Sequence, residues 1–223
     1  MSTDASDEKP KPQPISANAR RVLGVLVEKA KTTPDNYPLS LAALISGCNQ
    51  KSNRSPKMEV DNDDAINALD ELRSVGAARE VQGNGRVTKY RHAAYEWMDL
   101  DSPQAAVMTE LLLRGPQTAG EIRTRASRMS PLPDMAAAQN VLNQLMEKDL
   151  VEALSPPGRG QTFAHKLYPP DERQYLEARI EKQAATAPTP KKSQAEVDKL
   201  VARLDAVNER IDQLEQRIKE LES

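Results

Sequence analysis

The chain has 223 residues, one cysteine, 3% aromatic residues and a formal net charge of −2. This length accommodates one large or two small domains, and the shortage of aromatic residues argues against one large core. The balanced charge excludes a generally basic, histone-like polymer binder. Charge is nevertheless uneven, because residues 15–92 hold twelve Lys or Arg against nine Asp or Glu, and residues 102–170 hold seven against six.

The N-terminal residues 1–14 are polar and rich in proline and charge, so we expect a disordered tail. They contain no apolar run that could act as a signal peptide, and no later segment approaches the roughly 20 apolar residues of a membrane span. A single cysteine cannot form a disulfide within the chain, which favours a reducing compartment. We therefore predict a cytoplasmic protein that does not contact a membrane.

Residues 15–95 predict a first module of three helices and a β-hairpin. Helices are expected to begin at Ser16, at Ser40 and at Asp61 or Asn62, each a preferred N-terminal cap. The third helix is expected to bury one face that includes Ile66 and to end before Gly76. Strands at residues 77–82 and 86–92 then flank a glycine-containing turn.

The same order recurs in residues 101–170. Helices are expected to begin at Ser102, at Thr118 and at Asp134, the last with Met135 on its buried face, and strands follow at residues 150–154 and 162–167. Three helices followed by a hairpin, twice over, predict two tandem winged-helix domains. The expected fold class is mainly α with small β-hairpin wings, an α+β arrangement.

The tail predicts a helix from 171 to 182 and a Pro/Ala linker, together residues 171–192, and then a coiled coil at 193–223. Apolar residues alternate three and four positions apart along its seam: Val197, Leu200, Leu204, Val207, Ile211, Leu214, Ile218 and Leu221. The pattern of branched residues and flanking charges favours a parallel homodimer. The alternative is a helix that folds back on the globular part of its own chain.

Several short motifs resemble the YceH-like family of bacterial proteins, over about residues 15–170. In the first module they comprise Glu28, Lys29, residues 32–34, 37–40 and 48–51, Asn53, Arg54, Pro56 and residues 86–90. In the second they comprise residues 111–115, Thr118, Gly120, Glu121, Arg123, Arg125 and Ala126. The resemblance implies a tandem winged-helix fold. It implies no biochemical activity and supplies no catalytic residues.

Winged helices conventionally place the third helix in the major groove of DNA. In the first module this helix is acidic on the face expected to be exposed, which disfavours that docking. Basic residues around it are instead candidates for phosphate contacts: Lys51, Arg54, Lys57, Arg86, Lys89 and Arg91. The alternative is a solvated, charge-balanced surface.

The second module offers a better candidate for reading bases. Its third helix carries amides that can hydrogen-bond to base edges, and arginines precede it and occupy the wing. The candidates are Gln139, Asn140 and Asn143, with Arg123, Arg125, Arg128 and Arg159. Amides on a helix are also ordinary surface residues.

An enzyme has little support. His92 and His165 fall on strands of different modules, and no metal-ligand spacing is present, so we predict no catalytic residue, metal or cofactor. Cys48 is either a small buried residue or an activated thiol beside Lys51 and Arg54; burial is favoured. The leading hypothesis is nucleic-acid binding in a regulatory setting, and the alternative is an adaptor that binds a protein partner.

Overall fold

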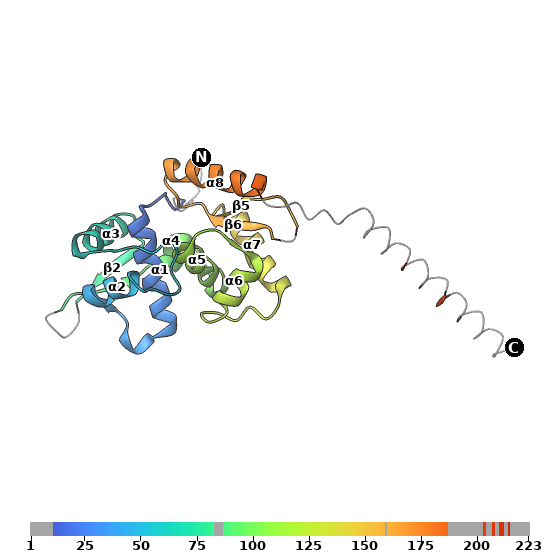
Figure 1. Cartoon of the computed structure of the whole chain (residues 1–223). Coiled ribbons are helices and arrows are strands. Elements are labelled where there is room, and N and C mark those ends of the chain that lie inside the picture. Colours follow the sequence, from blue (N-terminus) through green and yellow to red (C-terminus); the bar gives the residue numbers. More distant parts are fainter. Residues whose placement is uncertain are drawn as a thin grey trace, which may run out of the picture. The chain divides into compact units, whose positions relative to one another are not determined.

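The structure, a computed structural model, describes residues 11–82, 87–158 and 160–186 and the single positions 203, 207, 210, 211 and 214. The chain divides into two compact units, Met1–Ile180 and Glu181–Ser223. The first unit is a mixed α+β structure, mostly helical, with two small antiparallel sheets (Figure 1).

The first repeat is built from α1 (Ala17–Thr32), the 3-10 turn η1 (Pro34–Asn36), β1 (Leu39–Ser40), α2 (Leu41–Cys48), α3 (Asn62–Ser74), β2 (Ala78–Val81) and β3 (Lys89–His92). Its strands lie in the order β1-β3-β2. The expected helix starts are confirmed, because Ser16 and Ser40 cap α1 and α2, and Asp61 forms a capping box with Asp64 at α3. Strand β1 was not predicted, since two residues are too short to show an alternating pattern.

The second repeat follows the same order: α5 (Ser102–Arg114), β4 (Gln117–Thr118), α6 (Ala119–Ala126), α7 (Met135–Glu147), β5 (Val151–Ala153) and β6 (Thr162–His165). Its strand order β4-β6-β5 matches that of the first sheet. Thr118 and Glu121 form the expected capping box of α6, and Asp134 caps α7. An unpredicted short helix, α4 (Ala94–Met98), connects the repeats.

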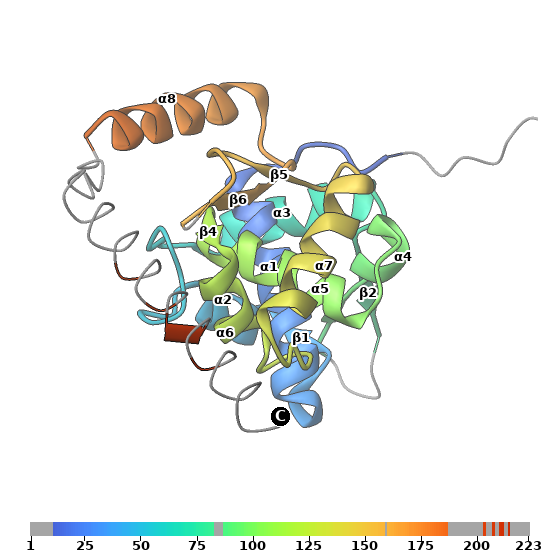
Figure 2. The ribbon, with the colours of Figure 1, turned by 90° about the vertical axis from the view of Figure 1, so that its right-hand side faces the viewer.

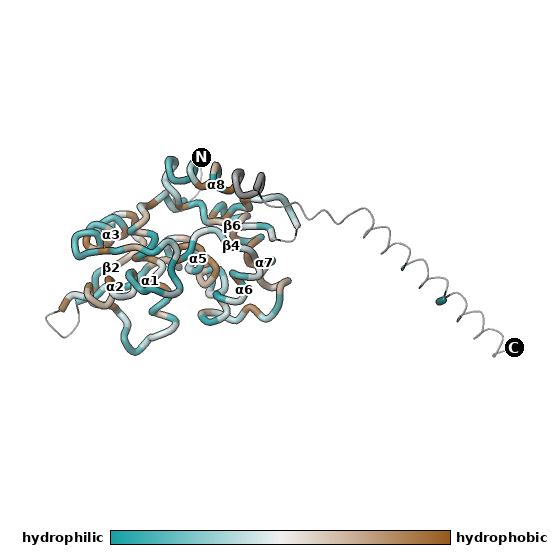
Figure 3. Tube along the Cα trace, in the orientation of Figure 1, coloured by the Kyte–Doolittle hydropathy of each residue, from teal (hydrophilic) through white to brown (hydrophobic). Residues whose placement is uncertain are grey.

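The two repeats share one continuous apolar core. Helices α1 and α5 pack side by side at its centre (Figure 2). They approach closely at Gly24, where an added Cβ would lie 2.8 Å from Leu113 Cδ2. Hydrophobic stretches occur in both repeats in the hydropathy view (Figure 3). The expected division between residues 95 and 101 therefore does not separate two cores.

Two residues expected in the core are instead exposed. Ile66 on α3 is 42% exposed and Met135 on α7 is 47% exposed. In α3 the buried stripe passes through Ala65, Ala68 and Leu69, so Ile66 falls beyond its edge. Met135 is the first residue of its helix, where the chain has only begun to turn toward the core.

Helix α8 (Pro170–Thr186) extends four residues beyond the predicted end at 182. Near its start, Glu172 pairs with Arg20 of α1, whose guanidinium lies 4.7 Å from the centre of the Tyr168 ring. The Tyr168 ring stacks on buried His165 at 4.0 Å between centroids. None of the helices in the described ranges combines the length and apolar character of a membrane span.

Candidate functional site

The sheet of the first repeat presents three cations on its outer face. Arg79 of β2 lies directly opposite Arg91 of β3, and the next pair on the same face is Val81 with Lys89. The opposite face carries Ala78, which is buried in the core. We call Arg79, Lys89 and Arg91 the basic sheet face.

The basic sheet face has no carboxylate partner among the described residues. Nearby Arg73, in contrast, pairs with Asp70 at 3.1 Å and with Glu80 at 3.6 Å. Two like charges directly opposite in a sheet repel each other, so Arg79 and Arg91 cost the free protein some stability. An anionic partner would relieve that repulsion. The sequence prediction included Lys89 and Arg91 but missed Arg79, which strand pairing alone brings beside Arg91.

The other basic candidates of the first repeat do not form one surface. Lys51 and Lys57 are exposed on the segment between α2 and α3, and Arg86 lies outside the described residues. Arg54 corrects the prediction of an exposed phosphate contact, because its side chain is fully buried. Its Nη2 donates to Glu28 Oε2 at 2.5 Å, and its Nε donates to the carbonyl of Gly47 at 3.0 Å.

Helix α3 carries acidic side chains with different roles. Asp63 and Asp70 are exposed. Asp64 accepts from the amide of Asn18 at 3.0 Å, and Glu71 accepts from the backbone nitrogen of Ser16 at 2.7 Å. Part of the predicted negative charge therefore holds α3 against the start of α1, and the remainder faces solvent.

A network of buried ion pairs crosses between the repeats. We call it the inter-repeat ion network. Its first-repeat members are Glu28 on α1 and Arg54 between α2 and α3, and its second-repeat members are Glu110 and Arg114 on α5 and Arg128 after α6. Arg128 Nη2 donates to Glu28 Oε1 at 2.5 Å and to Glu110 Oε1 at 2.9 Å. Arg114 Nη1 donates to Glu110 Oε2 at 2.5 Å. Arg128 thus directs its Nε and Nη2 groups into the network while its side chain stays 34% exposed, and its contact with nucleic acid remains a prediction.

Electrostatics keep this network charged. Burial alone would raise the pKa of Glu28, but hydrogen bonds and positive charge from Arg54 and Arg128 outweigh it and hold that pKa below its usual value. Burial lowers the pKa of Arg128, and Glu110 and Glu28 more than restore it. Each buried carboxylate is thus stable only with its arginine partners in place.

Two further arginines of the second repeat are also engaged. Arg123 donates to the carbonyl of Pro133 at 3.0 Å. Arg125 donates to Gln117 Oε1 at 2.5 Å and lies 3.4 Å from Glu121. Both side chains remain partly exposed, and their contact with nucleic acid remains a prediction.

The amides of α7 are accessible. Asn140 and Asn143 are exposed, and Gln139 is partly exposed and donates to Asn143 Oδ1 at 3.0 Å. Arg159, the predicted wing contact, lies outside the described residues. The three amide side chains are uncharged. They can hydrogen-bond to a partner but contribute little long-range electrostatic attraction.

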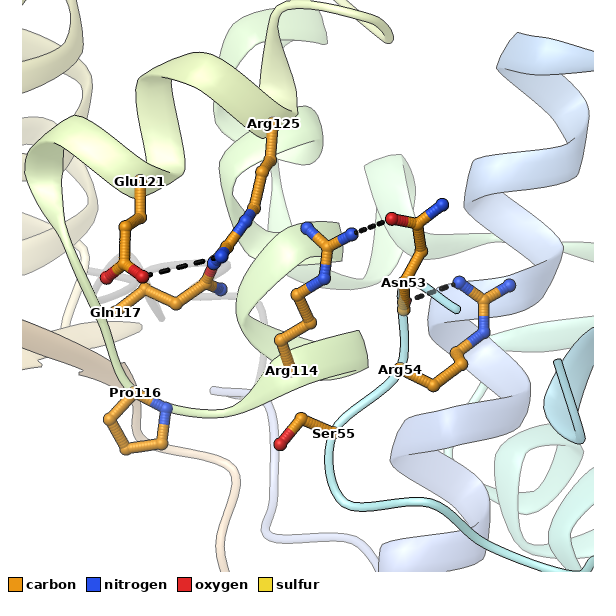
Figure 4. A pocket seen from close by; sticks show the side chains of 8 residues that line it. All are labelled: Asn53, Arg54, Ser55, Arg114, Pro116, Gln117, Glu121 and Arg125. Atoms are coloured by element: carbon orange, nitrogen blue, oxygen red, sulfur yellow. Dashed lines mark hydrogen bonds and ion pairs between the residues drawn. The ribbon is translucent and has the colours of Figure 1, made fainter. Parts of the chain in front are cut away.

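An open hollow of about 440 Å³ lies where the repeats meet. Figure 4 shows its wall: Asn53, Arg54, Ser55, Arg114, Pro116, Gln117, Glu121 and Arg125. Arg114 Nη2 donates across it to Asn53 Oδ1 at 2.5 Å. The hollow is thus walled by the segment before α3 on one side and by the end of α5 with α6 on the other.

The reactive side chains do not converge. Cys48 is buried, as favoured from sequence, and burial raises its thiol pKa to about 12. Burial lowers the pKa of His92 to about 4 and that of His165 to about 3, in separate repeats. Among the described residues no group of three or more His, Cys, Asp or Glu side chains could hold a metal ion.

Three predicted seam residues of the tail are described. Val207, Ile211 and Leu214 are helical and 51%, 48% and 53% exposed. The other five, Val197, Leu200, Leu204, Ile218 and Leu221, lie outside the described residues.

Comparison with known proteins identifies relatives but no activity. The family described as a protein of unknown function, DUF480, matches residues 15–159. The chain belongs to this family. A UPF0502 protein of Rhodopirellula baltica is 68% identical over 192 residues, which cover 86% of this chain and 80% of the relative. The UPF0502 proteins of Geotalea uraniireducens and Geobacter metallireducens are 49% and 52% identical, each over 66% of this chain and 69% of the relative.

The expected membership of an uncharacterised bacterial family is confirmed. The match covers both repeats up to the loop between β5 and β6 and stops before α8. The DUF480 and UPF0502 names state no substrate, reaction or partner, so function has to be argued from the surfaces described above.

Proposed function

We propose that this protein is a regulatory nucleic-acid-binding protein built from tandem winged helices, and that the basic sheet face supplies its main phosphate contacts. The single observation that carries the proposal is the pairing of Arg79 with Arg91, beside Lys89, on an outer sheet face without acidic partners in the described chain. Lys51 and Lys57 add exposed positive charge on the neighbouring segment of the same repeat.

The order of elements supports the winged-helix assignment. Each repeat runs helix, strand, helix, helix, strand, strand, and its first strand pairs with the last to complete a three-stranded sheet. The hairpin of each sheet takes the place of a wing. In the first repeat this puts the basic sheet face on the wing, an element that touches the nucleic-acid backbone in proteins of this architecture.

The proposed binding is mainly independent of sequence. Phosphate contacts give affinity and orientation, whereas base contacts give specificity. Asp63 and Asp70 on α3 disfavour insertion of that helix between phosphates. The exposed amides of α7 can read base edges, while Arg123, Arg125 and Arg128 each already donate to a partner within the protein.

Fluorescence anisotropy with a labelled DNA duplex across a range of KCl concentrations tests the proposal. Each lost phosphate contact reduces the slope of log affinity against log salt by about 0.9. The double variant Arg79→Ala/Arg91→Ala should therefore bind more weakly and lower the slope by about two. Lys11→Ala/Arg179→Ala removes the same charge from exposed positions elsewhere and should keep the wild-type slope. Absence of binding at the lowest salt, or equal effects of both variants, would refute it.

A second candidate function is supported by exposed apolar residues on the same helices. Ile66 lies on the acidic α3, and Met135 lies beside the amides of α7. Such mixed surfaces suit a protein partner better than a phosphate backbone. If the protein is an adaptor, Ile66→Ser should weaken partner binding while DNA affinity remains absent or unchanged.

We also propose that the tail forms a parallel coiled-coil homodimer and that the protein acts in the cytoplasm. Dimerisation would bring two weakly basic surfaces onto one duplex and raise their effective concentration. The half-exposed Val207, Ile211 and Leu214 support the dimer, since a helical partner would cover them.

A further inference from the structure

The hollow between the repeats lies among an excess of positive charge. Three arginines line it, Arg54, Arg114 and Arg125, and Arg128 adjoins them through Glu110, which it shares with Arg114. Three carboxylates oppose them, those of Glu28, Glu110 and Glu121. These four arginines therefore outnumber their three acidic partners by one.

Arg114 lies in an unfavourable electrostatic environment for its positive charge. Its side chain is only 10% exposed, and it has one carboxylate partner, Glu110. Burial lowers its pKa, and the charges of Arg125, Arg128 and Arg54 oppose the stabilising effect of Glu110. A second negative charge near Arg114 would therefore be favourable.

The guanidiniums of Arg114 and Arg125 also have more N–H donors than their contacts within the protein use. A guanidinium has five N–H donors. Arg114 uses donors on Glu110 and Asn53, and Arg125 uses donors on Gln117 and Glu121. Figure 4 shows these two guanidiniums in the same part of the hollow, whereas Arg54 turns its guanidinium away from them. The hydroxyl of exposed Ser55 lies on the wall below Arg114.

Glu121 is the one carboxylate on the wall, and a helix cap already engages it. Its Oε2 accepts from the backbone nitrogen and from the hydroxyl of Thr118, both at 3.0 Å. The contact with Arg125 is longer, at 3.4 Å, and both side chains are partly exposed. Arg125 can therefore turn to another anion while Glu121 remains on the cap.

We propose that this hollow binds a small, multiply charged oxyanion, a ligand that carries a phosphate or two carboxylates, between Arg114 and Arg125. The bound anion would contact α5 and α6 of the second repeat and residues 53–55 of the first. It would thus add a bridge beside the inter-repeat ion network. The site is separate from the basic sheet face, so this inference does not depend on nucleic-acid binding.

Isothermal titration calorimetry of the full chain with inorganic phosphate, and separately with succinate, tests the site at constant ionic strength in chloride. We expect binding of at least one anion at a single site per chain. Arg125→Gln should weaken it about tenfold, because a charge-assisted hydrogen bond is lost. Arg173→Gln removes an equally exposed arginine from α8, where it pairs with Glu152, and should leave the affinity unchanged.

The two arms identify the ligand class, since preference for phosphate over succinate indicates a tetrahedral anion and the reverse indicates a dicarboxylate. Arg125 is 37% exposed and outside the buried network, so we expect the variant to fold, which circular dichroism checks. Arg114→Lys provides a second variant, which keeps the charge and loses the planar fork, and should also weaken binding. The site is refuted if neither anion binds the wild type, or if Arg125→Gln and Arg173→Gln behave alike.

Discussion

Glu28 and Glu110 occupy equivalent places in the two repeats. Helix α1 ends at Thr32 and α5 ends at Arg114, so each glutamate lies four residues before the end of its helix. Arg54 and Arg128 neutralise them, and Arg128 contacts both. The duplication therefore includes a buried charge at the packing surface as well as the order of elements.

Loss of Arg54 should be strongly destabilising. Arg54→Ala leaves the Glu28 carboxylate, only 2% exposed, without its main partner. Removal of one member of a buried ion pair typically costs about 3 to 5 kcal/mol. Arg128→Ala should cost less, because Arg54 still holds Glu28. Urea unfolding measures both effects.

Arg73→Ala is the control for these variants, because its ion pair with Asp70 is exposed and should contribute at most about 1 kcal/mol. An Arg54→Ala protein as stable as Arg73→Ala would show that Glu28 is not buried as a charged group.

Gly24 should not tolerate a side chain. The Cβ of alanine would lie 2.8 Å from Cδ2 and 2.9 Å from Cγ of Leu113, which is fully buried and cannot move freely. We expect Gly24→Ala to lower the free energy of unfolding by about 1 to 3 kcal/mol, the usual cost of overpacking.

Gly120 on α6 has open space around the position of a Cβ, so Gly120→Ala should be neutral or stabilising by up to about 1 kcal/mol. Thermal unfolding of the two variants compares them. Equal midpoints would mean that α1 and α5 are not in close contact.

Low pH should reduce the free energy of unfolding because of His165. Burial, and then the charge of Arg20, lower its pKa to about 3, whereas the unfolded chain has the ordinary value near 6.5. As pH falls below about 6.5 the unfolded state binds a proton that the folded state does not, so stability falls by about 1.4 kcal/mol per pH unit.

His165→Asn should remove about 2 kcal/mol of the fall in unfolding free energy between pH 7 and pH 5, even though it also removes the contact with Tyr168. Tyr175→Phe, at an exposed position of α8, should keep the wild-type slope. An unchanged slope in His165→Asn would mean that this imidazole titrates normally.

Removal of the tail should change the oligomeric state. A chain ending at residue 182 should be a monomer in light scattering, and the full chain should be a dimer. Ile211→Asp places a charge on the seam and should also give a monomer. Gln213→Asp adds the same charge at an outer heptad position and should remain dimeric. A dimer that persists without the tail would contradict the coiled coil.

Most helix positions were predictable from sequence because their signals are local. Of the six helices predicted in the two modules, five are capped as expected, by Ser16, Ser40, Asp61, Thr118 and Asp134. The cap of α5 is Asp101, one residue before the expected Ser102. The short strands β1 and β4 and the helix α4 were missed, since elements of two to five residues carry no clear periodicity.

The candidate site was less predictable because it depends on pairing between distant segments. Arg54 and Arg128 resemble surface arginines in the sequence, and only the packing of α1 on α5 brings Glu28 and Glu110 to them. The position of Arg79 could have been predicted, because alternation along β2 and β3 places Arg79 on the same face as Arg91 once the pairing register of the two strands is known. The register itself depends on the turn between the strands.

The common core of the repeats has a consequence for any large ligand. Modules joined by a flexible tether must lose rotational freedom when both engage one target, and that loss opposes association. Here the packing of α1 against α5 fixes the separation of the two sheets when the protein folds. The distance between the two sheets is therefore fixed before binding, and the protein would favour targets whose contact points lie that distance apart.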